Sequence, residues 1–369
     1  MRRPRHGLRR LLLAALVVAC VAVAFYGTAG RNGRHDPVRV ARAAPPVPRL
    51  APPAPIPGYL LIADRGNGRM LLVDGAKRIL WRYPRPHASL QMPFRFDDDT
   101  FFGPVADRII SNQEDQHTIQ VISFPAGRVI WRYGHVNERG SAPGYLNTPD
   151  DAYLLRSGLI SVADAYNCRV IFIDPRTHRI VNAYGSPLRC HHDPPHSLGS
   201  VNGATPLPDN GTLISEINGS WVDDIGPNGK IQWAVRAPVS YPSDPQLLSP
   251  NRILIADYAH PGAALIMSRT GRVIWKYAPR SGPGELDHPS LAMRIAPDLI
   301  AINDDYRDRV VLVSISKHRI VWQYGHTDVP GTGPGYLNTP DGLDLLTPAA
   351  AMRVPAVRKL LLAAQRAHR

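Results

Sequence analysis

One short loop of this sequence concentrates the side chains that most often carry chemistry. It runs from Cys190 to His196 and reads CHHDPPH, so three imidazoles and one carboxylate lie within six residues. Imidazole and carboxylate groups bind divalent transition metals such as zinc, and a neutral imidazole can act as a general base. The spacing matches no established metal motif. The alternative interpretation is that these histidines are solvated loop residues or cap the ends of strands.

Candidate partners for this loop lie in a turn that recurs along the chain. Two copies read PGYLNTP, and a third, GPGELDHP, has His288 where the others have Thr148 and Thr339. Asp151 and Asp341 follow the two threonine-containing turns. The predicted catalytic groups, or ligands of a divalent metal such as zinc or calcium, are His192, His196 and His288. The predicted ligand-binding residues around them are Asp151, His191, Asp193 and Asp341.

These residues belong to a repeated framework. Six segments end in a pattern close to Trp-x-Tyr, centred on Trp81, Trp131, Asn182, Trp233, Trp275 and Trp322. Successive copies are 42 to 51 residues apart, and an apolar run that ends in an acid or amide lies upstream of each. Self-similarity at such a period is the sequence signature of a repeat architecture.

Each repeat predicts four short antiparallel strands. Its apolar runs are rich in Val, Ile and Leu and are separated by Gly, Asn, Asp and Pro turns, which is typical of strands and hairpins. Four strands per repeat, arranged radially, form a propeller blade. We therefore predict an all-β fold, a six-bladed β-propeller. The first repeat lacks its inner strand, and the surplus strand 342–346 would supply it, close the ring and remove the exposed sheet edges.

Two further patterns resemble known propeller families. GPGYLNTPDG (333–342) and SVADAYNCRVIFID (161–174) resemble NHL-repeat propellers, in which a Gly-x-Leu-x-x-Pro turn precedes an Ala-Asp-x-x-Asn-x-Arg hairpin. The endings GRVIWRY and GRVIWKY, from Gly127 and Gly271, resemble quinoprotein-like blades. The resemblance covers residues 58–346 and implies the fold, because propellers host enzymes, receptors and scaffolds alike. No vicinal cysteine pair or Cys-x-x-Cys-His site accompanies it, so neither PQQ nor haem is predicted.

A shorter stretch is similar to a family of enzymes. HSLGSVNGATPLPDNGTLIS (196–215), followed by IGPNGKIQW, resembles the inner strand and Leu-Pro-x-Asn-Gly turn of arylsulfotransferase-like propellers. In that family a histidine carries the sulfuryl group, which implies this role for His196. The metal-dependent lyases with NHL propellers use histidines from several blades, and His192, His196 and His288 resemble that arrangement.

Recurring charged and aromatic residues have a structural interpretation. An acid at the end of one strand and an arginine at the start of the next would brace a hairpin; the pairs are Asp64 with Arg69, Asp164 with Arg169 and Asp304 with Arg309. The repeated tryptophans are predicted to pack between blades. Cys168 and Cys190 are predicted to lie on one face, where a disulfide is chemically reasonable outside the cytoplasm. Two free thiols are the alternative.

The N-terminal segment predicts export. Five arginines in the first ten residues precede the apolar run 11–25, which is typical of a secretory signal or a signal anchor. The run is shorter than the roughly 20 residues that span a bilayer comfortably, and Gly27-Thr28-Ala29 offers a cleavage site. We predict a single-pass anchor in the cell membrane, with a cytoplasmic N-terminus and an extracytoplasmic propeller. A secreted protein is the alternative.

The chain therefore divides into four predicted parts. These are a signal anchor or signal peptide (1–30), a proline-rich linker (31–57), the propeller (58–346) and a basic C-terminal tail or helix (347–369). The last part is predicted to form a short basic helix starting near Pro355, where proline is well placed. A frayed tail is favoured over packing on the propeller's rim or contact with anionic lipid.

The distribution of net charge along the chain indicates which class of partner is expected. Residues 1–42 carry +8 and residues 347–369 carry +5, which together account for the net charge of +13. The propeller is thus neutral overall, which argues against a nucleic-acid partner. The predicted function is a membrane-tethered module that binds a protein, glycan or small molecule or acts as a scaffold. The alternative is an enzyme with a histidine-lined axial site, either a metal-dependent lyase or hydrolase or an arylsulfotransferase-like transferase.

Overall fold

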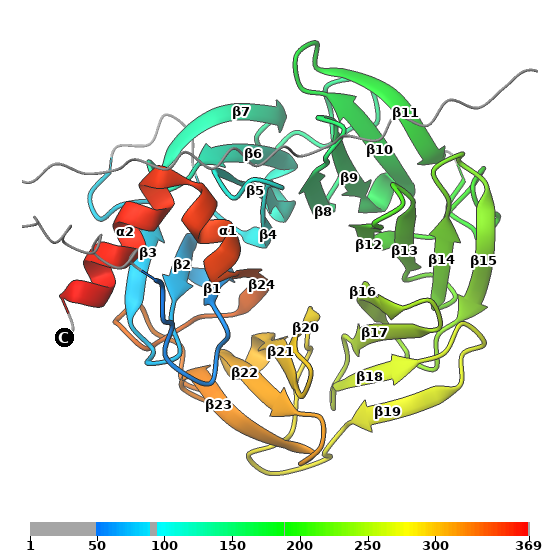
Figure 1. The fold of residues 1–369 in the computed structure, drawn as a ribbon. Helices are drawn as coiled ribbons and strands as arrows, with labels where there is room; N and C mark the ends of the chain where they lie inside the picture. Colours follow the sequence, from blue (N-terminus) through cyan, green and yellow to red (C-terminus); the bar gives the residue numbers. More distant parts are fainter. Residues whose placement is uncertain (1–48, 89–93, 188, 368–369) are drawn as a thin grey trace, which may run out of the picture. The chain divides into compact units, whose positions relative to one another are not determined.

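Six four-stranded antiparallel sheets form a ring around a central axis (Figure 1). The structure, a computed structural model, describes residues 49–88, 94–187 and 189–367. The predicted all-β six-bladed propeller is confirmed, with one sequence repeat per blade. The predicted anchor, signal and most of the linker lie outside the described residues. Within the described part of the chain, no helix is both long enough and apolar enough to cross a membrane.

The blades are numbered in chain order, and each is listed here from its inner to its outer strand. Blade 1 comprises β24 (Pro340–Leu346), β1 (Tyr59–Asp64), β2 (Arg69–Val73) and β3 (Ile79–Tyr83). Blade 2 comprises β4 (Asp97–Phe102), β5 (Arg108–Gln113), β6 (Thr118–Ser123) and β7 (Arg128–Gly134). Blade 3 comprises β8 (Pro149–Leu154), β9 (Ile160–Asp164), β10 (Arg169–Asp174) and β11 (Arg179–Gly185).

The remaining three blades follow the same order. Blade 4 comprises β12 (Val201–Pro206), β13 (Thr212–Glu216), β14 (Trp221–Ile225) and β15 (Ile231–Arg236). Blade 5 comprises β16 (Pro242–Ser249), β17 (Arg252–Asp257), β18 (Ala263–Met267) and β19 (Val273–Tyr277). Blade 6 comprises β20 (Ala292–Ala296), β21 (Leu299–Asp304), β22 (Arg309–Ser314) and β23 (Arg319–Gly325).

The last strand closes the ring. β24 pairs antiparallel with β1, so the C-terminal end of the propeller completes the first blade, as predicted. The strand starts at Pro340, two residues before the predicted start at Gly342. This closure pairs β1 on both sides, which leaves no open edge where the two ends of the repeat array meet.

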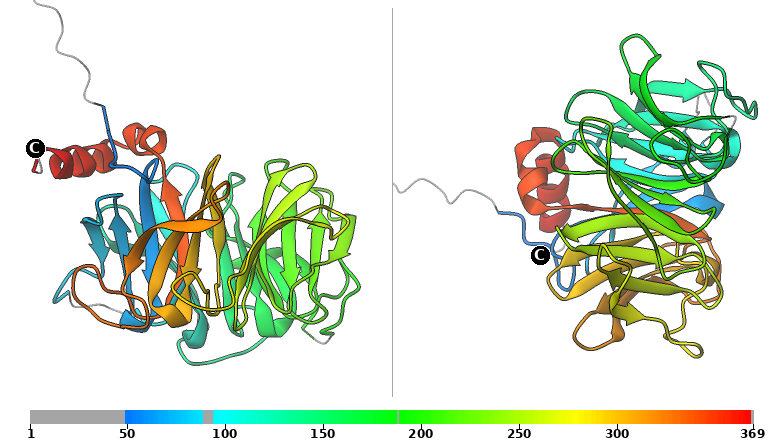
Figure 2. Two further views of the ribbon diagram at one scale, coloured as in Figure 1. Left: turned by 90° about the horizontal axis from the view of Figure 1, so that it is seen from below. Right: turned by 90° about the vertical axis from the view of Figure 1, so that its right-hand side faces the viewer.

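Two helices follow the closing strand. Thr347 caps α1 (Pro348–Arg353), and α2 (Pro355–Arg366) begins at a proline. Both helices lie on one face of the ring (Figure 2). Val357 and Leu361 of α2 are buried in a cluster with residues of blade 1. The predicted helix near Pro355 is therefore present, whereas the expectation of a frayed tail is wrong for residues 348–366, because the apolar side chains of this segment complete a core.

The predicted hairpin braces are present. Arg69, Arg169 and Arg309 each donate Nε–H to the acid that ends the preceding strand, at 2.5, 2.7 and 2.6 Å respectively. The same arginines also donate to carbonyl oxygens of the loop that arrives from the preceding blade. Each brace thus joins a hairpin to the loop that leads into an inner strand, and so positions the start of that strand.

The tryptophans of the outer strands join neighbouring blades. Each donates its indole N–H to a backbone carbonyl in the next blade, at 2.9 to 3.1 Å; the donors are Trp81, Trp131, Trp275 and Trp322. Because these bonds cross the blade boundaries, the predicted packing between blades is confirmed for these four residues.

Replacing Arg309 with methionine tests the brace in blade 6. Arg309 and Asp304 are almost completely buried, so the variant leaves an unpaired buried acid. We expect a loss of about 3–5 kcal/mol in the free energy of unfolding, measured by urea denaturation. In the double variant Asp304→Asn/Arg309→Met the loss should be clearly smaller, because no buried charge is left unpaired. Equal losses in the two variants would contradict a charge-paired brace.

Candidate functional site

Bulges at the start of the inner strands aim polar side chains at the axis. In five blades two consecutive residues face one residue of the neighbouring strand. These pairs are Asp98–Asp99, Asp150–Asp151, Asn202–Gly203, Asp244–Pro245 and Asp341–Gly342. A bulge bends its strand and redirects its side chains. The repeated bulge therefore surrounds the channel with carboxylates and amides.

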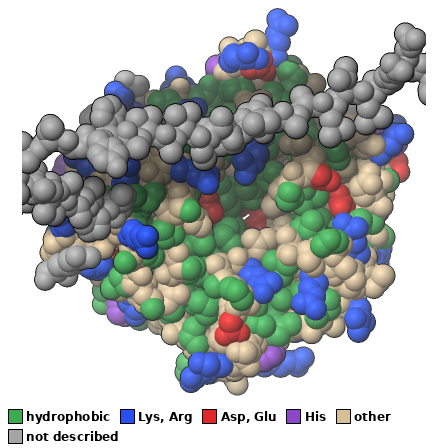
Figure 3. Space-filling model, in the orientation of Figure 1, with side chains coloured by type: hydrophobic (Ala, Val, Ile, Leu, Met, Phe, Trp, Pro, Cys, Tyr) green, Lys and Arg blue, Asp and Glu red, His purple; other side chains and the backbone are tan. Residues whose placement is uncertain are grey.

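One polar residue from every blade lines a cavity of about 280 Å³ at one mouth of the channel. These six residues are Asp98, Asp150, Asn202, Ser243, Ser290 and Asp341. We call this cavity the axial pocket. It lies at the end of the ring opposite to α1 and α2, because β24 runs from Asp341 in the pocket to Leu346 before α1. Figure 3 shows the ring from the helix side, with a hollow at its centre and acidic side chains inside.

Arg65 is the one cation of the axial pocket among the residues described as lining it. It begins the 3-10 turn η1 (Arg65–Asn67), between β1 and β2. Its guanidinium contacts Asp98 at 3.0 Å, Asp341 at 2.8 Å and Glu114 at 2.5 Å. It also contacts Asp115 at 3.2 Å. Arg65 thereby links blade 1 to blade 2 across the pocket.

The carboxyl groups of the pocket differ in their protonation. Burial raises the pKa of Glu114 to about 7, although Arg65 opposes this shift. Burial and the neighbouring Asp341 raise the pKa of Asp98 well above its usual range. Burial also acts on Asp341, but hydrogen bonding to Asp98 and the charge of Arg65 outweigh it, so the pKa of Asp341 is lowered. At neutral pH the pocket therefore holds protonated acids beside ionised ones.

A second group of acids lies adjacent to this ring. Asp99, Asp151 and Asp244 are each at most 5% exposed, and one carboxylate oxygen of each lies within 4.8 Å of the others. One oxygen of each has no hydrogen-bond partner among the described residues. Burial raises the pKa of Asp151 to about 7 and those of Asp99 and Asp244 well above their usual range. This group, like Asp98 with Asp99 and Asp150, could hold a cation.

The inner strands approach one another closely at this depth. A Cβ atom placed on Gly342 would lie 2.5 Å from the Cα of Asp99. Glycine is therefore required at this position of β24. Asp151 Oδ2 also accepts a hydrogen bond from the backbone N–H of Ala204 in the next blade, at 2.8 Å. The second group of acids thus lies where neighbouring blades touch.

Three tyrosines form part of the pocket wall. Tyr241, Tyr258 and Tyr306 come from loops of blades 5 and 6. Burial, with nearby acidic groups, raises the pKa of Tyr241 and of Tyr258, so these hydroxyl groups stay neutral. The rings of Tyr258 and Tyr306 lie edge to face, 6.3 Å apart. The wall therefore offers neutral hydroxyl groups and aromatic faces next to the carboxylates.

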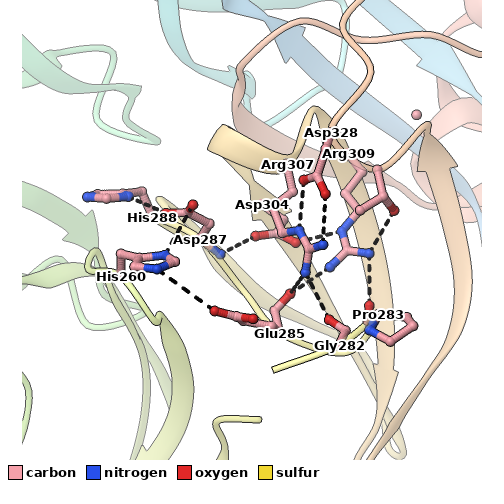
Figure 4. Close-up of polar contacts among 12 residues, drawn as sticks. His260, Gly282, Pro283, Glu285, Asp287, His288, Asp304, Arg307, Arg309 and Asp328 are labelled. Atoms are coloured by element: carbon pink, nitrogen blue, oxygen red, sulfur yellow. Dashed lines mark hydrogen bonds and ion pairs between the residues drawn. The ribbon is translucent and has the colours of Figure 1, made fainter. Parts of the chain in front are cut away.

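His288 lies beside this tyrosine wall in an ordered polar network (Figure 4). Its Nδ1 is 2.6 Å from Asp287 Oδ1, and the other oxygen of Asp287 is 3.2 Å from His260 Nδ1. The backbone N–H of Asp287 donates to Asp304, the acid of the blade 6 brace. The ring of His288 packs 4.3 Å from that of Tyr306. An imidazole held in this way by a carboxylate is oriented as a general base would be.

His192 lies in a different environment, in blade 4. Its Nδ1 is 3.2 Å from Glu216 Oε1 and 3.8 Å from Asp223 Oδ2. Burial and the neighbouring Glu216 raise the pKa of Asp223 to about 10. Cys190, two residues before His192, forms a disulfide with Cys168, and their Cα atoms are 5.3 Å apart. The disulfide connects the histidine loop to the hairpin of blade 3.

The remaining predicted site residues lie at the surface. His191, Asp193 and His196 are exposed, and His196 borders a surface depression near Tyr184 and Gly229. Among the described residues, no group with metal-ligand spacing contains His196 or His288. The structure therefore does not bring the three predicted histidines together as one ligand set. His192 finds two other partners, and His288 finds Asp287.

The predicted carboxylates Asp151 and Asp341 do lie at the axis, but at different levels. Asp341 is equivalent to Asp150, and Asp151 is equivalent to Gly342, because each pair occupies the same place in its bulge. The residues that complete the pocket, chiefly Arg65, Glu114 and Tyr258, were not among the predicted site residues. Four of the six polar residues around the axial pocket share a sequence signal that could have predicted them. Each directly follows a proline, namely Pro149, Pro242, Pro289 or Pro340.

Comparisons with known proteins show the fold. No protein-family model matches the chain, and no curated protein matches it in sequence. A protein of unknown function from Bacteroides caccae superposes with a TM-score of 0.53 at 15% identity, over 79% of this chain and 98% of that one. The nidogen/laminin complex contains a chain with a TM-score of 0.52 at 14% identity, over 77% and 97%. Both similarities support the β-propeller fold alone.

A third structure is less similar. Virginiamycin B lyase from Staphylococcus aureus, in complex with quinupristin, has a TM-score of 0.46 at 15% identity, over 67% of this chain and 73% of that chain. A likeness at this level carries no conclusion about activity.

The axial acids predict how stability depends on pH. The pKa of Asp151 is raised from 3.8 to about 7, so between these values the unfolded chain loses a proton that the folded chain keeps. The free energy of unfolding should therefore fall as the pH rises from about 4 to about 7, by on the order of 4 kcal/mol for this group. Urea denaturation in EDTA at pH 4 and pH 7.5 measures the fall.

Two variants assign this dependence. Asp151→Asn should remove most of the part of this fall in stability that Asp151 contributes. Asp107→Asn, which changes an exposed acid, should leave the fall unchanged. An Asp151→Asn variant whose stability falls as steeply as that of the wild type would contradict the assignment.

Proposed function

We propose that this protein is a ligand-binding propeller whose axial pocket receives a small cationic group, either a free organic amine or a basic side chain of a partner. The observation that carries the proposal is the composition of the pocket. Six acids and three tyrosines line it together with one arginine.

Charge favours a cation over an anion. Arg65 is saturated, because it already contacts four carboxylates. An incoming anion would meet Asp115 and Asp341 without a free cation to pair with. An incoming cation would let Glu114 and Asp98 ionise, and so would recover interactions that burial now suppresses.

The volume of the axial pocket and its aromatic wall suit a small ligand. A volume of about 280 Å³ is near the lower end of ordinary ligand pockets. The faces of Tyr258 and Tyr306 add an aromatic surface, and cations are attracted to the faces of aromatic rings by about 0.5–2 kcal/mol. Primary, secondary or quaternary ammonium groups therefore suit the pocket.

The proposed location is outside the cytoplasm, on a membrane anchor. The arginine-rich N-terminus with its apolar run supports an anchor, and the disulfide between Cys168 and Cys190 supports an oxidising compartment. Protease added to intact spheroplasts should cleave a C-terminal tag. Full protection of that tag would contradict this location.

Calorimetry with choline, putrescine and lysine methyl ester tests the ligand proposal. We expect at least one of these cations to bind the full chain, and to bind more tightly at pH 8 than at pH 6, because Glu114 ionises between these values. Glu114→Gln should weaken binding by about tenfold, which corresponds to about 1.4 kcal/mol.

Arg65→Gln should have the opposite effect, because it removes the resident cation that competes for the same carboxylates. Arg176→Gln is the matched control, since Arg176 is 87% exposed and pairs only with Asp174 among the described residues. Binding of acetate or sulfate in place of the amines, or weaker amine binding in Arg65→Gln, would contradict the proposal.

An enzyme is the second candidate, and the pair Asp287–His288 favours it. A general base held 2.6 Å from its carboxylate and packed against a wall residue of the pocket could take a proton from a bound ligand. This candidate predicts that a bound ligand is recovered chemically changed after incubation, as seen by mass spectrometry. His288→Ala should then return the ligand unchanged, whereas unchanged ligand from the wild type favours the binding function.

A further inference from the structure

Blade 4 departs from the brace that blades 1, 3 and 6 share. Glu216 occupies the position of Asp164 at the end of the second strand, and it accepts a hydrogen bond from the backbone N–H of Gly199 at 2.7 Å. Asp164 accepts one from Asn147 in the same way, also at 2.7 Å. Trp221, however, occupies the position of the arginine that pairs with this acid in blades 1, 3 and 6. A fully buried acid therefore lacks its usual guanidinium partner.

The same blade adds a second buried acid. Asp223 on β14 is 0% exposed, and it occupies a strand position that holds Leu71 in blade 1 and Ile171 in blade 3. Neither of its carboxylate oxygens has a hydrogen-bond partner among the described residues. Burying a carboxyl group without a partner is costly. An acid in this apolar position therefore needs either a proton shared with Glu216 or a cation.

Among the described residues, His192 is the basic group that contacts these acids. It lies 3.2 Å from Glu216 and 3.8 Å from Asp223. Arg236 packs over the ring of Trp221 at 5.0 Å, but no ion pair joins it to either acid within the described residues. A single imidazole therefore faces two carboxyl groups.

The three side chains have the spacing of metal ligands. One ligand atom each from His192, Glu216 and Asp223 lies within 4.8 Å of the others. The imidazole stacks on Trp221 with ring centres 3.8 Å apart and planes 2° from parallel, which orients its nitrogens. The disulfide of Cys190 anchors the loop, and His192 keeps 20% exposure. The group is thus rigid and can be reached from solvent.

We propose that His192, Glu216 and Asp223 bind one first-row divalent metal ion, for which zinc is the probe. One imidazole nitrogen and two carboxylate oxygens are ordinary zinc ligands, and three protein ligands leave a fourth position for water. The two charges of the ion would balance the two buried carboxylates. None of the three residues lines the axial pocket, so the proposal is independent of the cation-binding function.

The competing interpretation is a proton-sharing cluster. In that case Glu216 and Asp223 share a proton, His192 takes the place of the missing arginine, and no metal binds. The two interpretations differ in one observable, the metal affinity of the folded protein.

Zinc titration of the full chain, after EDTA treatment and dialysis, separates these interpretations. Calorimetry and elemental mass spectrometry should find one zinc ion per chain that both Asp223→Asn and His192→Gln lose, with affinity reduced more than tenfold. Asp223→Asn is isosteric, and circular dichroism checks that each variant folds. His196→Gln is the matched control, because it changes an exposed histidine in the same loop and should keep the zinc.

Each outcome decides the proposal. Loss of zinc in both site variants with retention in His196→Gln supports the site. A wild-type protein that binds no zinc overturns it, as does zinc binding that Asp223→Asn and His192→Gln leave unchanged. Equal loss in His196→Gln would also overturn it, because the ion would then bind to the exposed loop.

Discussion

The constraint on which this structure depends is the removal of carboxyl groups from water at the axis of the ring. Six inner strands meet there, and the bulges of four of them place Asp98, Asp99, Asp150, Asp151, Asp244 and Asp341 within a narrow channel. A buried carboxylate must be paired, protonated or bound to a cation. This protein uses the first two solutions at once. Arg65 pairs with some of the acids, and others, such as Asp99 and Asp244, keep their protons at neutral pH. The third solution is the function that we propose.

The same constraint acts away from the axis. In blades 1, 3 and 6 an arginine neutralises the buried acid at the end of the second strand and also holds the incoming loop. In blade 4 tryptophan takes the place of this arginine while a second acid is added. A repeat protein makes such a departure visible, because its other blades show which residue the position normally holds. Blade 4 therefore stands out as the one among these four where a buried acid pair needs another cation.

Much of the fold could be predicted from the sequence, because its cause is repetition. The Trp-x-Tyr ends, the Asp and Arg pairs and the surplus strand 342–346 each have a local signature, and the structure confirms their roles. The pocket was harder to predict. Arg65 and Glu114 belong to neighbouring blades and meet only when the ring closes, and no local pattern encodes that contact. The prediction that the histidines form one ligand set failed for the same reason. Ring geometry places His192 and His288 next to carboxylates and not next to each other.

The number of protons released on cation binding tests the central claim most directly. It is measured by calorimetry at pH 6.5 in two buffers with different ionisation enthalpies, using whichever amine binds. If the axial acids hold protons that a cation displaces, binding will release protons into the buffer, and the release will be smaller in Glu114→Gln. Binding with no proton release, or with proton uptake, would contradict the claim that protonated carboxyl groups form the cation site.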